Sequence, residues 1–291
     1  MEANMMFIHA LTPLHAGTGQ GIGVIDLPIA KETATGLPYL PGSSLKGVLR
    51  DRCQDNEIQS RLFGPAVEKI ANSELRAGEA QFSDQRLLLL PVRSLAGTFA
   101  WVTSPFILQR LKRELTAIGM DCPQEIPMPT SEQAHVHEKE NQLTIPLKEG
   151  HRRLVLEDID LTSKPSKEVS LWATWIGATL FDADWQKTLN QKICVVHDDI
   201  LSFLLETATV VIARNQLTED KTSNNLWYEE ALPAESILSG LILTHQISAN
   251  GRNASSALAE VTKLTKNLVQ LGGNATIGRG LCRLVMAEPG G

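Results

Sequence analysis

Hydrophobic and polar positions along the first part of the chain follow patterns that predict alternating strands and helices. Residues 5–11 predict a short strand, and residues 80–92 predict a longer one. Within residues 44–53, apolar side chains recur at the spacing of one helical face. A serine followed by proline, a favoured N-cap and first helical residue, starts a second amphipathic helix over residues 104–118. The N-terminal part is therefore expected to be mixed in secondary structure.

The C-terminal part shows a similar succession. Strand-like runs follow at residues 154–156, 207–216 and 237–247. A polar turn at 218–225 makes residues 207–233 an extended hairpin. Residues 255–271 are expected to form one long helix, with five apolar residues on one face and a glycine pair at its end. Residues 281–286 then predict a closing strand.

Between these two parts, residues 121–149 are polar and rich in proline, with no clear period. Such a stretch predicts a long insertion without regular structure. The succession of strand, helix, strand, insertion, strand, helix and strand fits a ferredoxin-like α+β sheet, from one side of which the inserted pieces project.

Composition narrows the class of protein. The formal net charge of −6 is not that of a typical nucleic-acid-binding domain, so any RNA-binding surface must come from local placement of Lys and Arg. Four scattered cysteines without a C-x-x-C pair argue against a zinc ribbon or a disulfide framework. The first residues lack the features of a signal peptide, and no apolar run is long enough to span a bilayer. We therefore expect a cytoplasmic protein.

The first segment that could carry chemistry runs from His15 to Asp26. It contains four glycines in seven residues, but it fits neither the Walker pattern nor the dinucleotide fingerprint. Its backbone can approach a ligand closely, and His15 and Asp26 form an acid–base pair at the two ends of a flexible arm. The alternative is a surface loop with incidental polar residues.

The second segment is residues 41–50, where Ser43 and Ser44 are expected to open a helix and expose its free N–H groups. Lys46 and Arg50 share one face of that helix. Together they form a plausible phosphate site. A capped amphipathic helix with a solvated basic face is the alternative.

The third segment is the glycine-rich loop at residues 271–280. Its backbone can lie along RNA while Arg279 pairs with a phosphate or stacks on a base. His135 and His137 are a weaker candidate, for a metal site, because they fall in the insertion and have no third ligand in view. The tryptophans are expected to be packing residues.

Together these segments resemble the RAMP superfamily, and in particular the backbone subunit of type III-B (Cmr) CRISPR effectors. The matching motifs, in chain order, are His15-Ala-Gly-Thr-Gly19, Val24-Ile-Asp-Leu-Pro-Ile29, Tyr39-Leu-Pro-Gly-Ser-Ser-Leu-Lys-Gly-Val-Leu-Arg50, Leu62-Phe-Gly64, Phe82-Ser-Asp84, Pro91-Val-Arg-Ser94, Trp227-Tyr-Glu-Glu-Ala-Leu-Pro233 and residues 272–280. The His15 and Trp-Tyr-Glu-Glu elements favour the type III-B subunit over its type III-A counterpart.

The resemblance implies a single RAMP domain over residues 1–291. Its RNA-recognition-type (RRM-type) palm would span about 1–120 and 236–291, with inserted fingers at about 121–165 and a thumb-type β-hairpin at about 206–235. Copies of such a subunit polymerise along a guide crRNA, together with other effector subunits. They cut complementary single-stranded target RNA at regular intervals, with specificity supplied by base pairing.

The resemblance also assigns roles to residues. Asp26 matches the catalytic aspartate and would serve a divalent metal, Mg²⁺ or Mn²⁺. His15, Tyr228, Glu229 and Glu230 match its helpers, and which of them acts stays open. The RNA-binding positions are Ser43, Ser44, Lys46, Arg50, Arg93, Asn274, Gly278, Arg279 and Gly280.

Two other functions are compatible with parts of the sequence. The chain could be a non-catalytic RNA-binding scaffold, although Asp26 in its Val-Ile-Asp-Leu-Pro context favours an enzyme. It could also be a guide-processing endonuclease of the same superfamily, which the element at residues 227–233 argues against.

Overall fold

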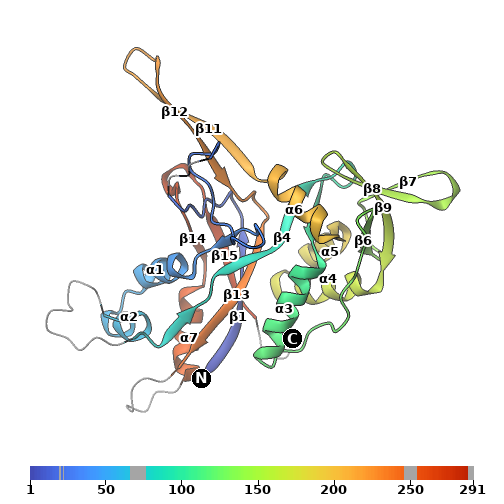
Figure 1. The fold of residues 1–291 in the computed structure, drawn as a ribbon. Coiled ribbons are helices and arrows are strands. Elements are labelled where there is room, and N and C mark those ends of the chain that lie inside the picture. Colours follow the sequence, from blue (N-terminus) through green and yellow to red (C-terminus); the bar gives the residue numbers. More distant parts are fainter. Residues whose placement is uncertain (20, 22, 66–76, 246–253, 288–291) are drawn as a thin grey trace.

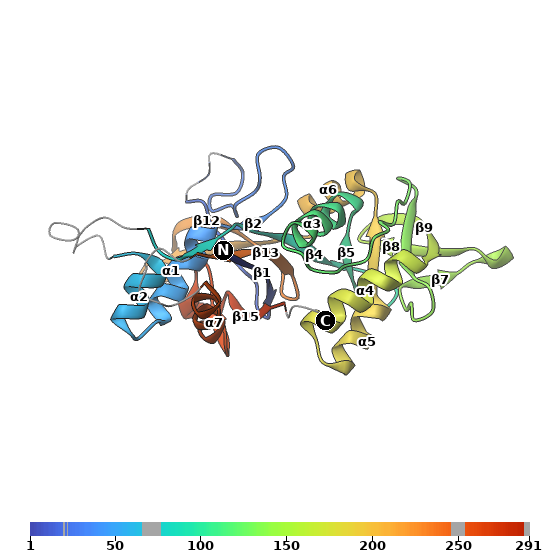
Figure 2. The same cartoon turned by 90° about the horizontal axis from the view of Figure 1, so that it is seen from below.

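The computed structural model describes the chain except for residues 20, 22, 66–76, 246–253 and 288–291. One large sheet runs through the described part, in the strand order β14-β15-β1-β13-β4-β5-β10-β6-β9-β8-β7. Its two halves lie side by side, with α1, α2 and α7 at one half and α3 to α6 at the other (Figure 2). The expectation that helices and strands alternate in an α+β chain is therefore confirmed.

The first half contains four neighbouring strands in the order β15-β1-β13-β4, each antiparallel to the next. A helix follows the first of these strands in sequence, and another precedes the last, which is the ferredoxin-like arrangement that the sequence predicted. The elements are β1 (Glu2–Ala10), α1 (Gly42–Arg52), β4 (Gln85–Arg93), β13 (Ile237–Thr244), α7 (Ala254–Leu264) and β15 (Leu281–Met286). We call this half the palm.

The central strand β1 is buried on both faces, which explains why it lacks a polar alternation. The helix α7 packs against β1 and β13. From the opposite face, Trp175 makes an edge contact with Phe7, and Phe181 makes one with His9. The aromatic residues of the second half therefore complete the core of the palm.

Beyond β4 the sheet continues with six strands, of which β5 and β10 are parallel and β6 and β9 are parallel. Helices α4 and α5 pack together and contact this part of the sheet. The elements are β5 (Phe99–Thr103), α3 (Pro105–Ala117), β6 (Gln133–His137), β7 (Thr144–Pro146), β8 (Arg152–Leu156), β9 (Ile159–Ser166), α4 (Lys167–Leu180), α5 (Ala183–Lys192), β10 (Ile193–Val196) and α6 (Asp198–Thr207).

A separate two-stranded hairpin projects from the body of the molecule (Figure 1). Its strands are β11 (Val210–Leu217) and β12 (Ser223–Ala231), antiparallel with one register shift near the tip. We call it the thumb hairpin. Short elements complete the fold: β2 (Tyr39–Leu40), α2 (Asn56–Phe63), β3 (Ala80–Phe82), the 3₁₀ turn Lys148–Gly150, β14 (Leu268–Gln270) and the 3₁₀ turn Ala275–Ile277.

The predicted long helix over residues 255–271 is wrong in its second half. The helix α7 ends at Leu264, and Leu268–Gln270 form β14, which pairs with β15. Asn267, with φ of 64°, makes the turn between them. Leucines at helical spacing fit either structure over so few residues, and the free edge of β15 decides in favour of a strand.

The prediction of an unstructured insertion over residues 121–149 is also wrong. Strand β6 lies inside the sheet between β10 and β9, and it is buried along four of its five residues. His135 and His137, expected on an exposed loop, are therefore buried.

Among the described residues, no helix is long and apolar enough to cross a membrane.

Candidate active site

The described residues of the range 15–31, which leave out 20 and 22, form an arm that folds back against the base of the thumb hairpin. Isolated bridges join Leu14 to Leu232, Gly17 to Ile29, and Leu27 to Glu229. The hydrogen bonds from Leu27 N to Tyr228 O and from Glu230 N to Leu27 O are both 3.0 Å long. This stretch of the arm therefore runs beside β12 almost as a third strand of the hairpin.

Asp26 is exposed at the outer part of the arm. Its Oδ2 accepts a hydrogen bond of 2.8 Å from the backbone N of Tyr228. This bond fixes the position of the carboxylate while leaving it acceptor sites for a ligand. Tyr228 itself is 41% exposed, so its side chain is accessible at the surface.

His15 is half-buried rather than mobile, contrary to the expectation of a flexible arm at this end. Its Nδ1 lies 2.6 Å from the backbone oxygen of Glu230. Because a carbonyl only accepts, Nδ1 carries the proton, and in the neutral ring Nε2 is left as an acceptor. A Cβ at Gly17 would lie 2.5 Å from Nε2, and a Cβ at Gly273 would lie 3.0 Å from Cδ2. The two glycines therefore make room for the imidazole ring and leave Nε2 uncovered by a side chain at either position.

Glu230 is buried at the base of the arm and does not face solvent. One carboxylate oxygen accepts from the Nζ of Lys31 at 2.7 Å, and the other accepts from the N of Ile29 at 3.2 Å. Both oxygens are used to hold the arm. Glu230 therefore anchors the arm, and the catalytic help that the resemblance implies for it stays a prediction.

Glu229 is buried on the other side of the same strand. It accepts hydrogen bonds from Arg214 Nε (3.1 Å), Trp227 Nε1 (2.9 Å) and Asn274 Nδ2 (3.0 Å). Burial would raise the pKa of this carboxyl, but the indole of Trp227 and the guanidinium of Arg214 outweigh it and hold the pKa below its ordinary value. Glu229 is thus an ionised link between the thumb hairpin and the loop at residues 271–280.

The start of α1 differs from its prediction. The helix begins at Gly42 after Pro41, so Ser43 and Ser44 lie exposed in the first turn and do not cap it. Gly42 N donates to the carboxylate of Asp84 at 2.9 Å, which occupies part of the expected anion site.

On the same helix, Lys46 is half-buried. Arg50 donates from Nη1 to the oxygen of Gly64 at 2.9 Å, and so holds the end of α2. Of the two predicted cations, Arg50 therefore has a structural task as well. Arg93 is exposed at the end of β4.

The loop at residues 271–280 lies against His15 and Glu229. Gly273 N donates to His15 O at 2.9 Å. A side chain at Gly280 would overlap the oxygen of Leu271, whereas the space around Gly278 is open. Gly280 is therefore needed for the turn itself. Gly278 and the half-buried Arg279 are at the outer part of the loop.

A divalent metal was expected at Asp26. Within the described residues, no group of three or more His, Cys, Asp or Glu is arranged to hold a metal ion. Glu229 and Glu230 accept from protein donors, as described above. The single exposed carboxylate of Asp26 fits a Mg²⁺ that keeps several waters and takes its other ligands from substrate phosphate. The donor set does not fit a closed protein cage.

Comparison with known proteins shows the family of the chain. The family model of the RAMP superfamily matches residues 7–283. A Pyrococcus furiosus protein, CRISPR system Cmr endoribonuclease Cmr4, is 32% identical over 300 residues, covering 99% of this chain and 97% of the relative. The chain belongs to the RAMP superfamily, in its Cmr4 family.

Solved structures give the same relationship. Oligomeric Cmr4 from Pyrococcus furiosus superposes with a TM-score of 0.76 at 27% identity, covering 100% of both chains. A chain of the type III-B Cmr-beta complex bound to cognate target RNA superposes with a TM-score of 0.73 at 20% identity, covering 98% of this chain and 97% of the other. The latter likeness shows a shared fold.

Sequence reasoning missed three residues of this RAMP site. Lys31 pairs with Glu230, while Arg214 and Trp227 fix Glu229. Arg214 and Trp227 are a cross-strand pair of the thumb hairpin. The alternation along the two predicted strands could have placed them on one face, but the partner they share is set by tertiary contact.

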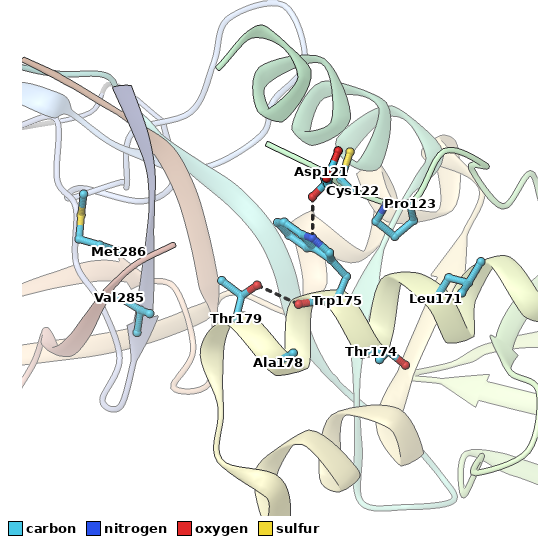
Figure 3. A pocket seen from close by; sticks show the side chains of 10 residues that line it. All are labelled: Asp121, Cys122, Pro123, Leu171, Thr174, Trp175, Ala178, Thr179, Val285 and Met286. Carbon is cyan, nitrogen blue, oxygen red and sulfur yellow. Dashed lines mark hydrogen bonds between the residues drawn. The ribbon is translucent and has the colours of Figure 1, made fainter. Parts of the chain in front are cut away.

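The RAMP chain also has a cleft of about 710 Å³ between α4 and the end of β15 (Figure 3). Trp175 reaches across it, and its indole donates to the oxygen of Asp121 at 2.9 Å. Burial raises the pKa of the Cys122 thiol, which makes it a weak nucleophile. This cleft offers mainly apolar surface, so the candidate chemistry lies at the arm.

Proposed function

We propose that this chain is the repeated backbone subunit of a type III-B effector and that Asp26 is the catalytic residue with which it cuts target RNA. The observation that carries the proposal is the exposed carboxylate of Asp26, held on the arm by Tyr228 N, in a chain that matches the Cmr4 endoribonuclease from end to end. Its partners are a guide crRNA, a complementary target RNA, further copies of itself and other effector subunits.

The reaction assigned to this site is transesterification within the RNA. The 2′-oxygen next to the scissile phosphate attacks phosphorus, the bond to the 5′-oxygen breaks, and a cyclic phosphate and a 5′-hydroxyl result. The 2′-hydroxyl proton must be removed and the leaving oxygen must gain one. Asp26 lies exposed for this exchange, and His15, in the same arm, offers an acceptor nitrogen on a ring held by Glu230 O.

A Mg²⁺ or Mn²⁺ ion held by Asp26 and by substrate phosphate would stabilise the charge that develops on the phosphate. In this arrangement Tyr228 N orients Asp26, while Glu229 and Glu230 hold the arm and the loop. The basic face of α1 and the outer part of the loop at residues 271–280 are assigned to RNA backbone.

The test uses the assembled guide-RNA complex and an end-labelled complementary RNA. Asp26→Asn keeps the acceptor for Tyr228 N and removes the charge, so cleavage should fall by about 10²- to 10⁴-fold. Target affinity and the melting temperature should stay at wild-type values, because Asp26 is exposed. In the wild type, a chelator should abolish cleavage and added Mg²⁺ or Mn²⁺ should restore it.

Wild-type cleavage by Asp26→Asn would leave the chain as an RNA-binding scaffold or move the chemistry to Tyr228. Cleavage that survives chelation would remove the metal from the proposal while leaving Asp26 in place.

A further inference from the structure

A cleft of about 430 Å³ lies between the arm and the thumb hairpin, directly beside Asp26. This volume is within the range of about 300–1,000 Å³ that is usual for small-ligand sites. Its walls come from two sources: Gly21, Asp26 and Leu27 of the arm, and Gln216, Asn225 and Trp227 of the hairpin. A molecule in the cleft would therefore touch the catalytic carboxylate and the hairpin together.

Trp227 gives the cleft an aromatic wall whose orientation is fixed. Its Nε1 donates to Glu229 Oε1 at 2.9 Å, and Glu229 is itself held by Arg214 and Asn274. An aromatic side chain with its polar edge already bonded presents a flat apolar surface at little cost in entropy. Such surfaces bind nucleobases by stacking, whatever the base.

Gln216 and Asn225 add hydrogen-bonding capacity on the same side. They face each other as a cross-strand pair of the hairpin, and both line the cleft. In the described part of the chain, neither side-chain amide makes a hydrogen bond to another residue. Each amide offers one acceptor and two donors, a set that matches the edge of a base and suits adenine best.

From these observations we infer that the cleft is a nucleobase subsite, which holds the base of the nucleotide next to the phosphate that Asp26 addresses. The inference rests on the proposed function. Attack by a 2′-oxygen in line with the leaving oxygen is not available inside a regular A-form duplex. The nucleotide at the cut must leave the stack, and its base needs a place to go. Trp227 supplies the stacking surface, and the amides of Gln216 and Asn225 read the base edge.

The test measures single-turnover cleavage by the assembled guide-RNA complex at one cut position. Five targets carry adenine, guanine, cytosine, uracil or an abasic nucleotide at that position, with the guide matched to each base. We expect adenine to be cut fastest and the abasic target at least about tenfold more slowly, since stacking on one aromatic is worth roughly five- to hundredfold.

Variants of the hairpin assign the effect to the cleft. Asn225→Ala and Gln216→Ala should reduce the ratio of adenine cleavage to cleavage at the other three bases toward one, while the abasic target stays slow because Trp227 is still present. Asn224→Ala is the matched control: it removes the same amide from the neighbouring position of β12, which does not line the cleft, and should preserve the ratio.

Two results would overturn the inference while leaving the proposed function intact. One is a wild-type complex that cuts all five targets at the same rate. The other is a base dependence that Asn225→Ala and Gln216→Ala leave unchanged. A wild-type complex that cuts no target contradicts the proposed function itself, and this subsite with it.

Discussion

The candidate site has an outer part, Asp26 and Tyr228, and a base, Glu229 and Glu230, and the two regions differ in burial. Asp26 and Tyr228 are exposed, and one backbone hydrogen bond joins them. Glu229 and Glu230, next in the chain, are buried and ion-paired with Arg214 and Lys31. The carboxylates of Glu229 and Glu230 therefore hold the arm and the loop at residues 271–280 in place. The carboxylate of Asp26 is left accessible to a substrate.

This difference is consistent with what a site for a large, charged polymer requires. Under the proposed function, RNA must approach the carboxylate of Asp26 from solvent, so that carboxylate cannot be sealed by protein partners. A flexible glycine-rich arm would by itself lose the geometry, and misplacement by about 1 Å can cost 10²-fold in rate. The buried carboxylates of Glu229 and Glu230, each paired with a partly exposed cation, supply the rigidity that the glycines remove.

The largest effect that would test this comparison is expected from Glu230→Ala. It removes the acceptor for Ile29 N and the partner of Lys31, so the arm loses its anchor. We expect a loss of about 1.5–3 kcal/mol in stability, and a fall in cleavage of about 10²-fold from misplacement of Asp26. Thermal melting of the chain and cleavage by the complex are the two measurements.

The control for this variant is Glu235→Ala, which removes the partner of the buried His9 away from the arm. Its melting temperature should fall while cleavage persists. If Glu230→Ala lost cleavage without losing stability, Glu230 would act on substrate, as the family resemblance first implied, and the division between base and outer part would be wrong.

A smaller effect is expected from Gly17→Ala. The added methyl group would push the His15 ring from its place, because the nearest ring atom lies 2.5 Å from the new Cβ. Cleavage should fall by about ten- to hundredfold, less than for Asp26→Asn, since His15 assists. Gly23→Ala changes the same arm at a position with open space around it, and its cleavage rate should match the wild type. Equal rates for both variants would show that the held orientation of His15 is irrelevant.

The smallest effect concerns α1, away from the arm. Lys46→Ala should lower the slope of log affinity against log salt for single-stranded RNA by about 0.7, the value of one phosphate contact. Lys46 is the better choice than Arg50, because Arg50 also holds Gly64. Lys187→Ala, an exposed lysine of α5, should leave the slope unchanged. An unchanged slope in Lys46→Ala would remove this helix face from the RNA path.

Several elements of the fold were predictable, because each of them depends on a local pattern in the sequence. The first strand, α1, α3, the hairpin and the closing strand were found from periodicity and turn residues, whereas α2 and α4 to α6 were not predicted. The failures have tertiary causes. Leu268–Gln270 are a strand because β15 offers an edge to pair with, and β6 is buried because β10 and β9 flank it. The proposed boundaries of palm, fingers and thumb stay a prediction.

The sequence by itself determined which polar side chains the arm carries. Glycines at 17, 19, 21 and 23 place His15 and Asp26 at the two ends of a glycine-rich loop, and this follows from the residues alone. The catalytic roles of the two side chains come from the family resemblance and stay a prediction. Only the tertiary structure decided what each acidic residue does. Glu230 is bound by Lys31, about 200 positions away in the chain, and Asp26 has no such cation beside it among the described residues. Burial and ion pairing depend on which distant segments meet, and three consecutive residues, Tyr228, Glu229 and Glu230, therefore have three different environments.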